Sequence, residues 1–311
     1  MVEDNQIKAQ VSPFAIREGE IKTFDGKDGY VSMNQIVHKI NIGHINEIHF
    51  AILELVNEFE FITSRQLYQM LEIKGIDPKS QDKLNNKLDQ LVKSKILTRY
   101  YFTSDEGKGI YRIYCLEKMG KYLLNSKEIE CKWQPSDNTK PVPMIKKRLA
   151  GNQTIIAYLR KVKAFDSYIV KPAITAKATG KLFKATGGAV KLTKNGKSIQ
   201  FVFEVVRREQ DWQKKLVEKM RLYKDFYENF VPGDSGFSGM PQLILICEDE
   251  KHMAECFKEI VTNQVEIPQI KLYFSTDLRQ NEETLENTLV DFKLVDGKYK
   301  MENVELKLLG I

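Results

Sequence analysis

The strongest constraint on the fold is the stretch over residues 77–115, where a polar helix is followed at once by two short strands. Three leucines at helical spacing predict a helix over 78–92 that buries one narrow stripe. Asp77 is placed to cap this helix, and Pro78 suits its first position because the N–H that proline lacks would be unpaired there. The two strands flank a glycine-containing turn segment and indicate a hairpin.

The residues before this stretch supply two more helices. The apolar period indicates a first helix over 45–59, and Thr63 with Gln66 matches a capping box that opens a second. The hairpin over 97–116 is followed by a final short helix. The order helix, helix, helix, hairpin predicts a winged helix-turn-helix domain over residues 45–125.

The polar face of the third helix indicates DNA binding. Its side chains are of the types that hydrogen-bond base edges or neutralise phosphates, and the hairpin is basic. The alternative is a winged helix used for protein contacts, which the acidic residues Asp82 and Asp89 on the same helix favour. The expected DNA contacts in this domain are Lys79, Gln81, Lys83, Asn85, Asn86, Lys87, Arg99, Lys108 and Arg112.

The basic residues are concentrated in one segment. Residues 1–145 carry 20 basic and 20 acidic side chains, whereas residues 146–200 carry 13 basic and one acidic side chain. Lysines grouped in this way neutralise phosphates without reading sequence, so we expect nonspecific DNA affinity from this segment. The alternative is a solvated, lysine-rich surface. The expected contacts are Lys146, Lys147, Arg148, Arg160, Lys161 and Lys163.

The rest of the chain sets the domain organisation. Residues 1–44 have no regular pattern and are expected to form an irregular arm, and residues 126–145 are proline-rich and polar, as in a linker. Residues 146–311 alternate strand and helix patterns, with a hairpin signal at Asn195-Gly196 and another at Asp296-Gly297. The expected fold class is therefore mixed α/β (α+β): a winged helix-turn-helix followed by a basic α/β domain.

Several classes of protein are not expected. No apolar run approaches the roughly 18 residues of a membrane span, and the first residues lack a secretory pattern. The four cysteines include no CxxC pair and are expected to be buried thiols, which fits a reduced, cytoplasmic setting. The four histidines show no metal-ligand spacing with these cysteines. We expect no metal and no cofactor.

A strand over 199–206 and an amphipathic helix over 211–230 together resemble the replication-relaxation family of plasmid and mobile-element proteins. The resemblance implies an N-terminal winged helix and a second domain similar to restriction-endonuclease folds. It also implies a role in replication, DNA relaxation or conjugative transfer of a plasmid, conjugative transposon or other integrative element. The residues that carry it are Glu204, Lys215, Leu216, Lys219, Leu222 and Tyr223.

Metal-dependent cleavage by such a fold needs an Asp on one strand and an acid-x-Lys motif on the next. Glu204 occupies a fitting place, but Val206 stands in the lysine position and Gly187-Gly188 stand where the Asp is required. One carboxylate holds Mg²⁺ poorly, so we expect a non-catalytic relative.

The expected partners are double-stranded DNA, other replication or transfer proteins and a second copy of the chain in a homodimer. Two alternative functions stay open. One is an Mg²⁺-dependent nuclease in which Asp166 or Glu209 assists Glu204. The other is a winged-helix transcription regulator whose second domain senses a partner.

Overall fold

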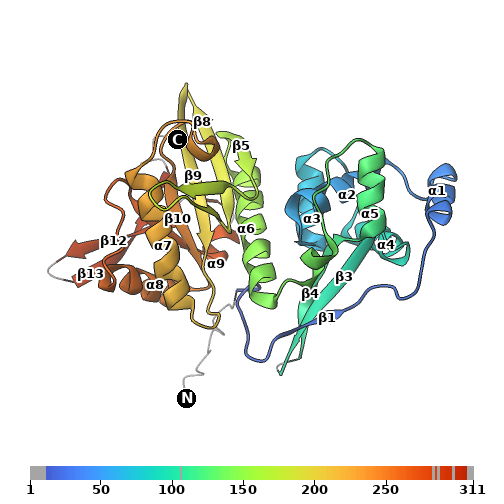
Figure 1. The fold of residues 1–311 in the computed structure, drawn as a ribbon, viewed down its shortest axis with the longest axis horizontal. Coiled ribbons are helices and arrows are strands. Elements are labelled where there is room, and N and C mark those ends of the chain that lie inside the picture. The colour runs from blue at the N-terminus through green and yellow to red at the C-terminus, as the bar shows by residue number, and fades with distance from the viewer. Residues whose placement is uncertain (1–11, 106, 282–283, 286–287, 296–297, 307–311) are drawn as a thin grey trace, which may run out of the picture.

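In the computed structural model of the chain, the described residues are 12–105, 107–281, 284–285, 288–295 and 298–306, with backbone alone for 107–110 and 298. They form two units that lie side by side. Helix α6 (Val142–Lys161) runs along the second unit on the side that faces the first (Figure 1).

The first unit combines helices with a four-stranded antiparallel sheet in the order β1-β3-β4-β2. The predicted order of three helices and a hairpin is confirmed, and so is the capping box. The side chain of Thr63 accepts from the Gln66 N–H, and the side chain of Gln66 accepts from the Thr63 N–H. The elements are β1 (Ile21–Phe24), α1 (Met33–Asn41), α2 (Glu47–Phe59), β2 (Ile62–Thr63), α3 (Ser64–Ile73), α4 (Gln81–Lys93), β3 (Leu97–Ser104), β4 (Gly107–Leu116) and α5 (Lys118–Ser126).

The start of α4 differs from the prediction. The helix begins at Gln81 and is capped by Ser80, whose hydroxyl accepts from the Lys83 N–H at 3.2 Å. The Asp77 carboxylate instead accepts from the Lys79 N–H at 2.7 Å, which closes a turn. Lys79 has a φ of 65°, a value that no right-handed helix contains, so Pro78 lies outside the helix.

The arm is more regular than expected. Strand β1 pairs with β3 over four residues, and α1 is opened by a capping box between Ser32 and Gln35. Neither element has a long apolar period, because β1 is an edge strand and α1 buries Ile36 alone. Period-based prediction therefore had little signal to detect.

The segment over 126–145 holds a short 3-10 helix, η1 (Pro135–Thr139), and the first turn of α6. Buried Asn138 donates to the Leu116 carbonyl at 2.8 Å and accepts from the Trp133 indole at 3.1 Å. The second unit's first helix was predicted over 152–163, whereas α6 begins ten residues earlier. Of the three prolines that indicated a linker, Pro135 begins η1, while Pro141 is the N-cap residue of α6 and Pro143 lies in its first turn, where proline is tolerated.

The second unit is built on a seven-stranded sheet in the order β13-β12-β11-β10-β9-β8-β5. Strands β9, β10 and β11 are parallel and the other pairs are antiparallel, which confirms a mixed α/β architecture. The elements after α6 are β5 (Phe165–Ile169), β6 (Ala173–Ala176), β7 (Lys181–Lys184), β8 (Gly188–Lys194), β9 (Lys197–Val205), α7 (Trp212–Glu228), η2 (Asp234–Gly236), β10 (Gln242–Cys247), α8 (Glu250–Thr262), β11 (Leu272–Thr276), α9 (Asp277–Asn281), β12 (Leu289–Val295) and β13 (Lys298–Val304).

Both hairpin signals fall between paired strands. Asn195 and Gly196 have φ values of 52° and 76°, as a tight hairpin turn between β8 and β9 requires, so this prediction is confirmed. Strands β12 and β13 also pair, while the predicted turn at Asp296-Gly297 lies outside the described residues.

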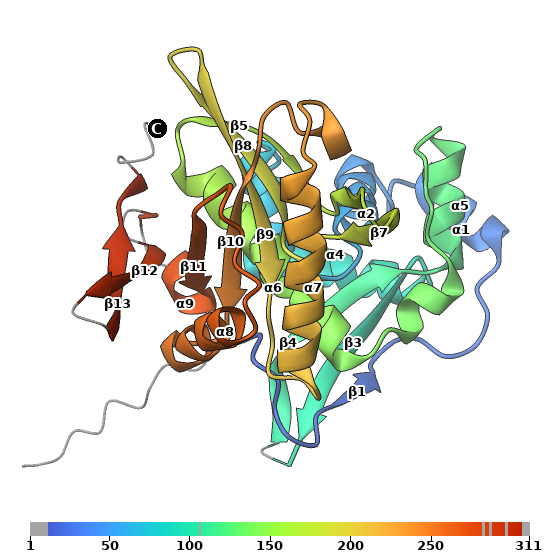
Figure 2. The same cartoon turned by 60° about the vertical axis from the view of Figure 1, so that its left-hand side comes forward.

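The sheet is covered on both faces, and side chains of one strand alternate between two cores. Phe201 and Phe203 of β9 belong to the core on the α6 side, whereas Val202 belongs to the core beneath α7 and α8. Figure 2 shows α7 and α8 in front of the sheet. The buried aromatic stripe of α7, including Tyr223 and Tyr227, confirms the prediction that it serves the core.

Helix α6 joins the two units. Asn152 donates to the carbonyls of Phe59 and Phe61 at 3.2 and 2.7 Å, and Gln66 donates to the Leu149 carbonyl at 2.7 Å. One cluster of buried apolar residues is continuous from the first unit through α6 to strand β9. The relative position of the units is therefore set by packed side chains and buried hydrogen bonds. No helix in the described part of the chain is long and apolar enough to cross a membrane.

Candidate nucleic-acid interface

A cleft of about 1070 Å³ lies where α3, α4 and β4 of the first unit meet α6 and α9 of the second. The residues that line it are Pro13, Phe14, Thr63, Ser64, Arg65, Gln69, Gln81, Asn85, Tyr101, Tyr111, Arg112, Tyr114, Gln153, Ala157, Arg160, Lys161, Leu278, Gln280 and Asn281. Four of these are basic and none is acidic, so the cleft has the charge that a polyanion requires.

Helical spacing explains why polar side chains gather here. Arg65 and Gln69 on α3, like Gln81 and Asn85 on α4, are four residues apart and so share one helix face. Gln81 donates to Asn85 at 3.2 Å. Gln153 of α6 donates to Gln69 at 3.4 Å and so connects the two walls of the cleft.

Five residues predicted to contact DNA line this cleft: Gln81, Asn85, Arg112, Arg160 and Lys161. They come from three elements far apart in the sequence, which only the fold brings together. Arg112 is bonded to Asp25 at 3.0 Å, and Lys161 donates to the Gln280 carbonyl at 3.1 Å. Arg160 is exposed and forms no ion pair with any residue that the structure describes.

Arg65, Gln69 and Gln153 were missed in the sequence. Arg65 is exposed and, within the described residues, has no ion pair. The available signal was the i, i+4 spacing of polar residues on the face opposite each buried stripe. This signal identifies a face of a helix and does not show which faces meet.

Other predicted contacts lie outside the cleft. Lys79, Lys83 and Asn86 are exposed, and Lys87 is half-buried, all on or before α4. Lys163 is exposed just after α6. The backbone of Lys108 lies in β4, but its side chain is outside the described set.

The basic residues at the start of α6 are engaged inside the protein. Lys146 is 2% exposed and pairs with Glu20 at 2.5 Å, and Lys147 pairs with Glu209. Arg148 lies 3.5 Å from Glu60. We therefore withdraw these three residues from the expected DNA surface, because each neutralises an acid of the fold.

Arg99 is engaged in the same way. Its guanidinium bonds to Asp89 of α4 and lies 2.9 Å from Asp25 of the arm. It ties the hairpin to α4, and we withdraw it as well. Within 146–200, by comparison, several of the 13 basic residues form ion pairs with acidic residues elsewhere in the chain, as described for Lys146, Lys147 and Arg148.

The position of the nuclease motif is filled by packing and hydrogen bonds. A Cβ at residue 187 would lie 2.6 Å from the Cβ of Phe203, and a Cβ at residue 188 would lie 2.6 Å from the Cδ1 of Ile155. An aspartate at residue 187 would require the backbone of β9 to move, because the Phe203 carbonyl oxygen would lie 2.8 Å from its Cβ. At residue 188 the φ of 87° is a backbone conformation that side chains other than glycine rarely adopt.

The carboxylate of Glu204 is buried and already bonded. It accepts from the hydroxyls of Tyr223 at 2.8 Å and Thr186 at 2.9 Å, and Lys219 lies 3.6 Å away. Burial and the adjacent Glu204 raise the pKa of Tyr223 well above its usual value, so this phenol remains a donor. Asp166 of β5 forms a partly exposed ion pair with Lys191 of β8 at 3.0 Å.

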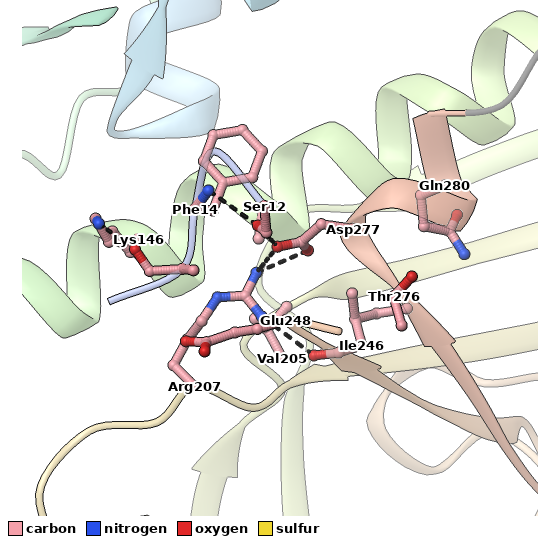
Figure 3. Close-up of polar contacts among 12 residues, drawn as sticks. Ser12, Phe14, Lys146, Val205, Arg207, Ile246, Glu248, Thr276, Asp277 and Gln280 are labelled. Carbon is pink, nitrogen blue, oxygen red and sulfur yellow. Dashed lines mark hydrogen bonds and ion pairs between the residues drawn. The ribbon is translucent and has the colours of Figure 1, made fainter. Parts of the chain in front are cut away.

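The carboxyl ends of the three parallel strands hold a second polar cluster (Figure 3). Arg207, which is fully buried, donates to both carboxylate oxygens of Asp277 at 2.8 and 2.9 Å. Ser12 of the arm donates to the same carboxylate, and the Ile16 N–H donates to Glu248 at 3.2 Å. Burial raises the pKa of Asp277 above its usual value, although Arg207 and Ser12 act against this. The arm thus covers the edge where open α/β sheets commonly bind ligands.

One histidine lies near cysteines, contrary to expectation. Ligand atoms of Cys247, His252 and Cys256 lie within 4.8 Å of one another. It is the one set of three or more His, Cys, Asp or Glu side chains with metal-binding proximity in the described part of the chain. The sequence predicted no metal-ligand spacing between the histidines and the cysteines, and Cys247 approaches the other two only because β10 packs against α8.

These features define a mixed α/β protein in which a helix-and-hairpin unit is joined by a shared helix to a parallel-centred sheet. The sequence profile of the Replication-relaxation family matches residues 53–236, which is more than half of the chain. The chain belongs to the Replication-relaxation family, and the predicted resemblance is confirmed.

Other comparisons are distant. No curated protein matches the sequence. Among solved structures, the restriction endonuclease FokI is similar at 10% identity with a TM-score of 0.25. The similarity covers 75% of this chain and 42% of the FokI chain, so this chain spans less than half of that enzyme.

Proposed function

We propose that this protein binds double-stranded DNA along the cleft between its two units, and that residues 45–125 act as a winged helix-turn-helix. In this proposal Gln81 and Asn85 of α4 read base edges. Arg65, Arg160 and Lys161 contact phosphates. The role is in replication, DNA relaxation or transfer of a plasmid or integrative element.

The observation that carries the proposal is the convergence of basic residues from both units on one cleft without a lining acid. Phosphate contacts supply affinity, and amide side chains on a helix distinguish adenine from other bases. The cleft offers both kinds of group within one surface. The tyrosines on its wall, such as Tyr101, add faces against which sugars or bases can pack.

We propose further that the second unit is a non-catalytic relative of restriction-endonuclease folds. The glycine packing at residues 187–188 and the bonded carboxylate of Glu204 support this reading over the nuclease alternative. A transcription regulator would use the same DNA surface and differ in its partners.

The test measures duplex binding by fluorescence anisotropy at several salt concentrations. Arg160→Glu and Arg65→Glu are compared with Lys214→Glu, which makes the same charge change at an exposed site on α7. We expect each cleft variant to weaken binding at least about tenfold and to reduce the salt slope by about 1. Single-stranded DNA of the same sequence serves as the comparison ligand.

Equal binding by Arg160→Glu, Arg65→Glu and Lys214→Glu would refute the cleft as the DNA site. Tighter binding of the single strand than of the duplex would replace the proposed ligand.

A further inference from the structure

One side of the seven-stranded sheet ends in a strand with an open edge. Among the described residues, β13 is the last strand of the sheet and pairs with β12 alone. It lies at the outer margin of the second unit in both views, on the side opposite the first unit (Figures 1 and 2). An edge strand presents backbone N–H and C=O groups that can pair with another strand. None of the residues of β13 lines the DNA cleft, so this edge is independent of the proposed function.

One face of the β12–β13 pair is apolar and only partly covered. The register places Phe292 opposite Met301 and Leu294 opposite Tyr299. The Phe257 ring of α8 stacks on Phe292 with ring centroids 4.2 Å apart, and it meets the Tyr299 ring edge-on at 4.8 Å. Leu294, Tyr299 and Met301 nevertheless remain 63%, 50% and 44% exposed. Helix α8 thus covers the inner part of this face and leaves an apolar outer part at the edge.

The opposite face of the same pair carries charges in an unfavourable arrangement. Lys300 lies directly opposite Lys293. Glu302 lies directly opposite Asp291. Like charges at opposed positions destabilise an antiparallel pair, and Lys293 relieves part of this by reaching diagonally to Glu302 at 2.5 Å. Lys300 is exposed and forms no ion pair with any residue that the structure describes.

A second copy of the chain can supply the opposite charges. When two copies of one strand pair antiparallel about a twofold axis, opposed residues lie on the same face of the sheet. With Met301 on the axis, Lys300 of each copy faces Glu302 of the other copy. Moving the axis to Lys300 or to Glu302 places that residue opposite itself, so like charges meet. The charge pattern therefore favours the Met301 register over its two neighbours.

We propose that two copies of this chain form a homodimer in which their β13 strands pair antiparallel with Met301 on the twofold axis. Backbone hydrogen bonds then extend the sheet of one copy into that of the other. Two pairs between Lys300 and Glu302 fix the register on one face. On the other face, Met301 and Tyr299 of both copies cover each other, which removes apolar surface from water. Lysines on an edge strand commonly prevent such pairing, and Glu302 offsets that effect in this register.

The test measures the mass of the full chain by analytical ultracentrifugation over a dilution series without DNA. We expect a reversible monomer–dimer equilibrium for the wild type. Lys300→Glu brings acidic side chains together across the axis, and Glu302→Lys brings basic ones together. Each variant alone should dimerise at least about tenfold more weakly than the wild type. Lys214→Glu makes the same charge change at an exposed site on α7 and should dimerise as the wild type does.

Mixing the two variants separates a lost contact from a lost fold. In a mixed dimer the acidic side chains of the Lys300→Glu strand face the basic side chains of the Glu302→Lys strand. An equimolar mixture should therefore dimerise about as tightly as the wild type, although neither component does so alone. Circular dichroism checks that each variant is folded.

Cross-linking tests the register. Met301→Cys brings two thiols together at the axis, so mild oxidation should give a covalent dimer. Asn303→Cys should give far less, because Asn303 faces Tyr299 of the other copy. The four native cysteines are buried and contribute little background.

Three results would overturn the proposal. One is a wild type that remains monomeric, which would leave the edge to a different chain. Another is a dimer that Lys300→Glu weakens no more than Lys214→Glu does. The third is a mixture of Lys300→Glu and Glu302→Lys that dimerises no more tightly than its separate components.

Discussion

The buried ion pair between Lys146 and Glu20 allows an effect on folding stability to be distinguished from an effect on DNA binding. Lys146 was expected to contact phosphate, yet its side chain is 2% exposed and that of Glu20 is 6% exposed. Lys146 also donates to the Ala15 carbonyl and lies 5.3 Å from the centre of the Phe102 ring. It therefore connects α6, the arm and the hairpin.

Removing one partner leaves the other charge buried without compensation. We expect Glu20→Ala to reduce the free energy of unfolding by about 3–5 kcal/mol. The double variant Glu20→Leu with Lys146→Met replaces both charges by apolar groups of similar size. The double variant should lose less unfolding free energy than Glu20→Ala does, because neither side chain of the pair then carries a buried charge.

The assay is urea unfolding followed by circular dichroism at neutral pH, with duplex binding measured on the folded proteins. The double variant should bind DNA as the wild type does, since neither residue lines the cleft. Arg160→Glu should show the reverse, with a stability change within about 0.5 kcal/mol and weakened binding. A cost below about 1 kcal/mol for Glu20→Ala, or selective loss of DNA binding in the double variant, would refute the reasoning.

Two further predictions concern acids of the fold. Desolvation raises the pKa of Glu60, but Lys171, Lys140 and Arg148 outweigh this and lower it below 4.5. The stability from this cluster is therefore complete above pH 4.5 and is lost as pH falls through the folded pKa, so unfolding of Glu60→Gln should depend less on pH in the acid range. For Glu204, supercoiled plasmid incubated with Mg²⁺ should stay intact with both wild type and Glu204→Ala; nicking that Glu204→Ala abolishes would establish a nuclease.

Local patterns predicted much of the fold. The capping box at Thr63 and the hairpin at Asn195-Gly196 are confirmed because each depends on neighbours within a few residues. Element ends were less accurate. Helix α4 starts later than predicted because Lys79 adopts a left-handed conformation. Helix α6 starts earlier than predicted because Pro141 at the N-cap and Pro143 in the first turn occupy positions where a helix tolerates proline.

Charge was the weaker guide to the site. The sequence counted the cations of 146–200 but could not show that Lys146, Lys147 and Arg148 face acids from distant segments. Arg65 is the opposite case: it lies in a part of the sequence with no excess of basic residues, so it was not predicted, yet the fold places it on the cleft.

By itself, the sequence determined the mixed α/β class of the chain and the family, because periodicity, capping and a strand-helix motif are local properties of the chain. The tertiary structure decided which basic residues remain at the surface, why residues 187–188 are glycines, and that Cys247, His252 and Cys256 meet. The physical reason is that burial and ion pairing depend on contacts between residues distant in the sequence, such as the 126 positions that separate Glu20 from Lys146.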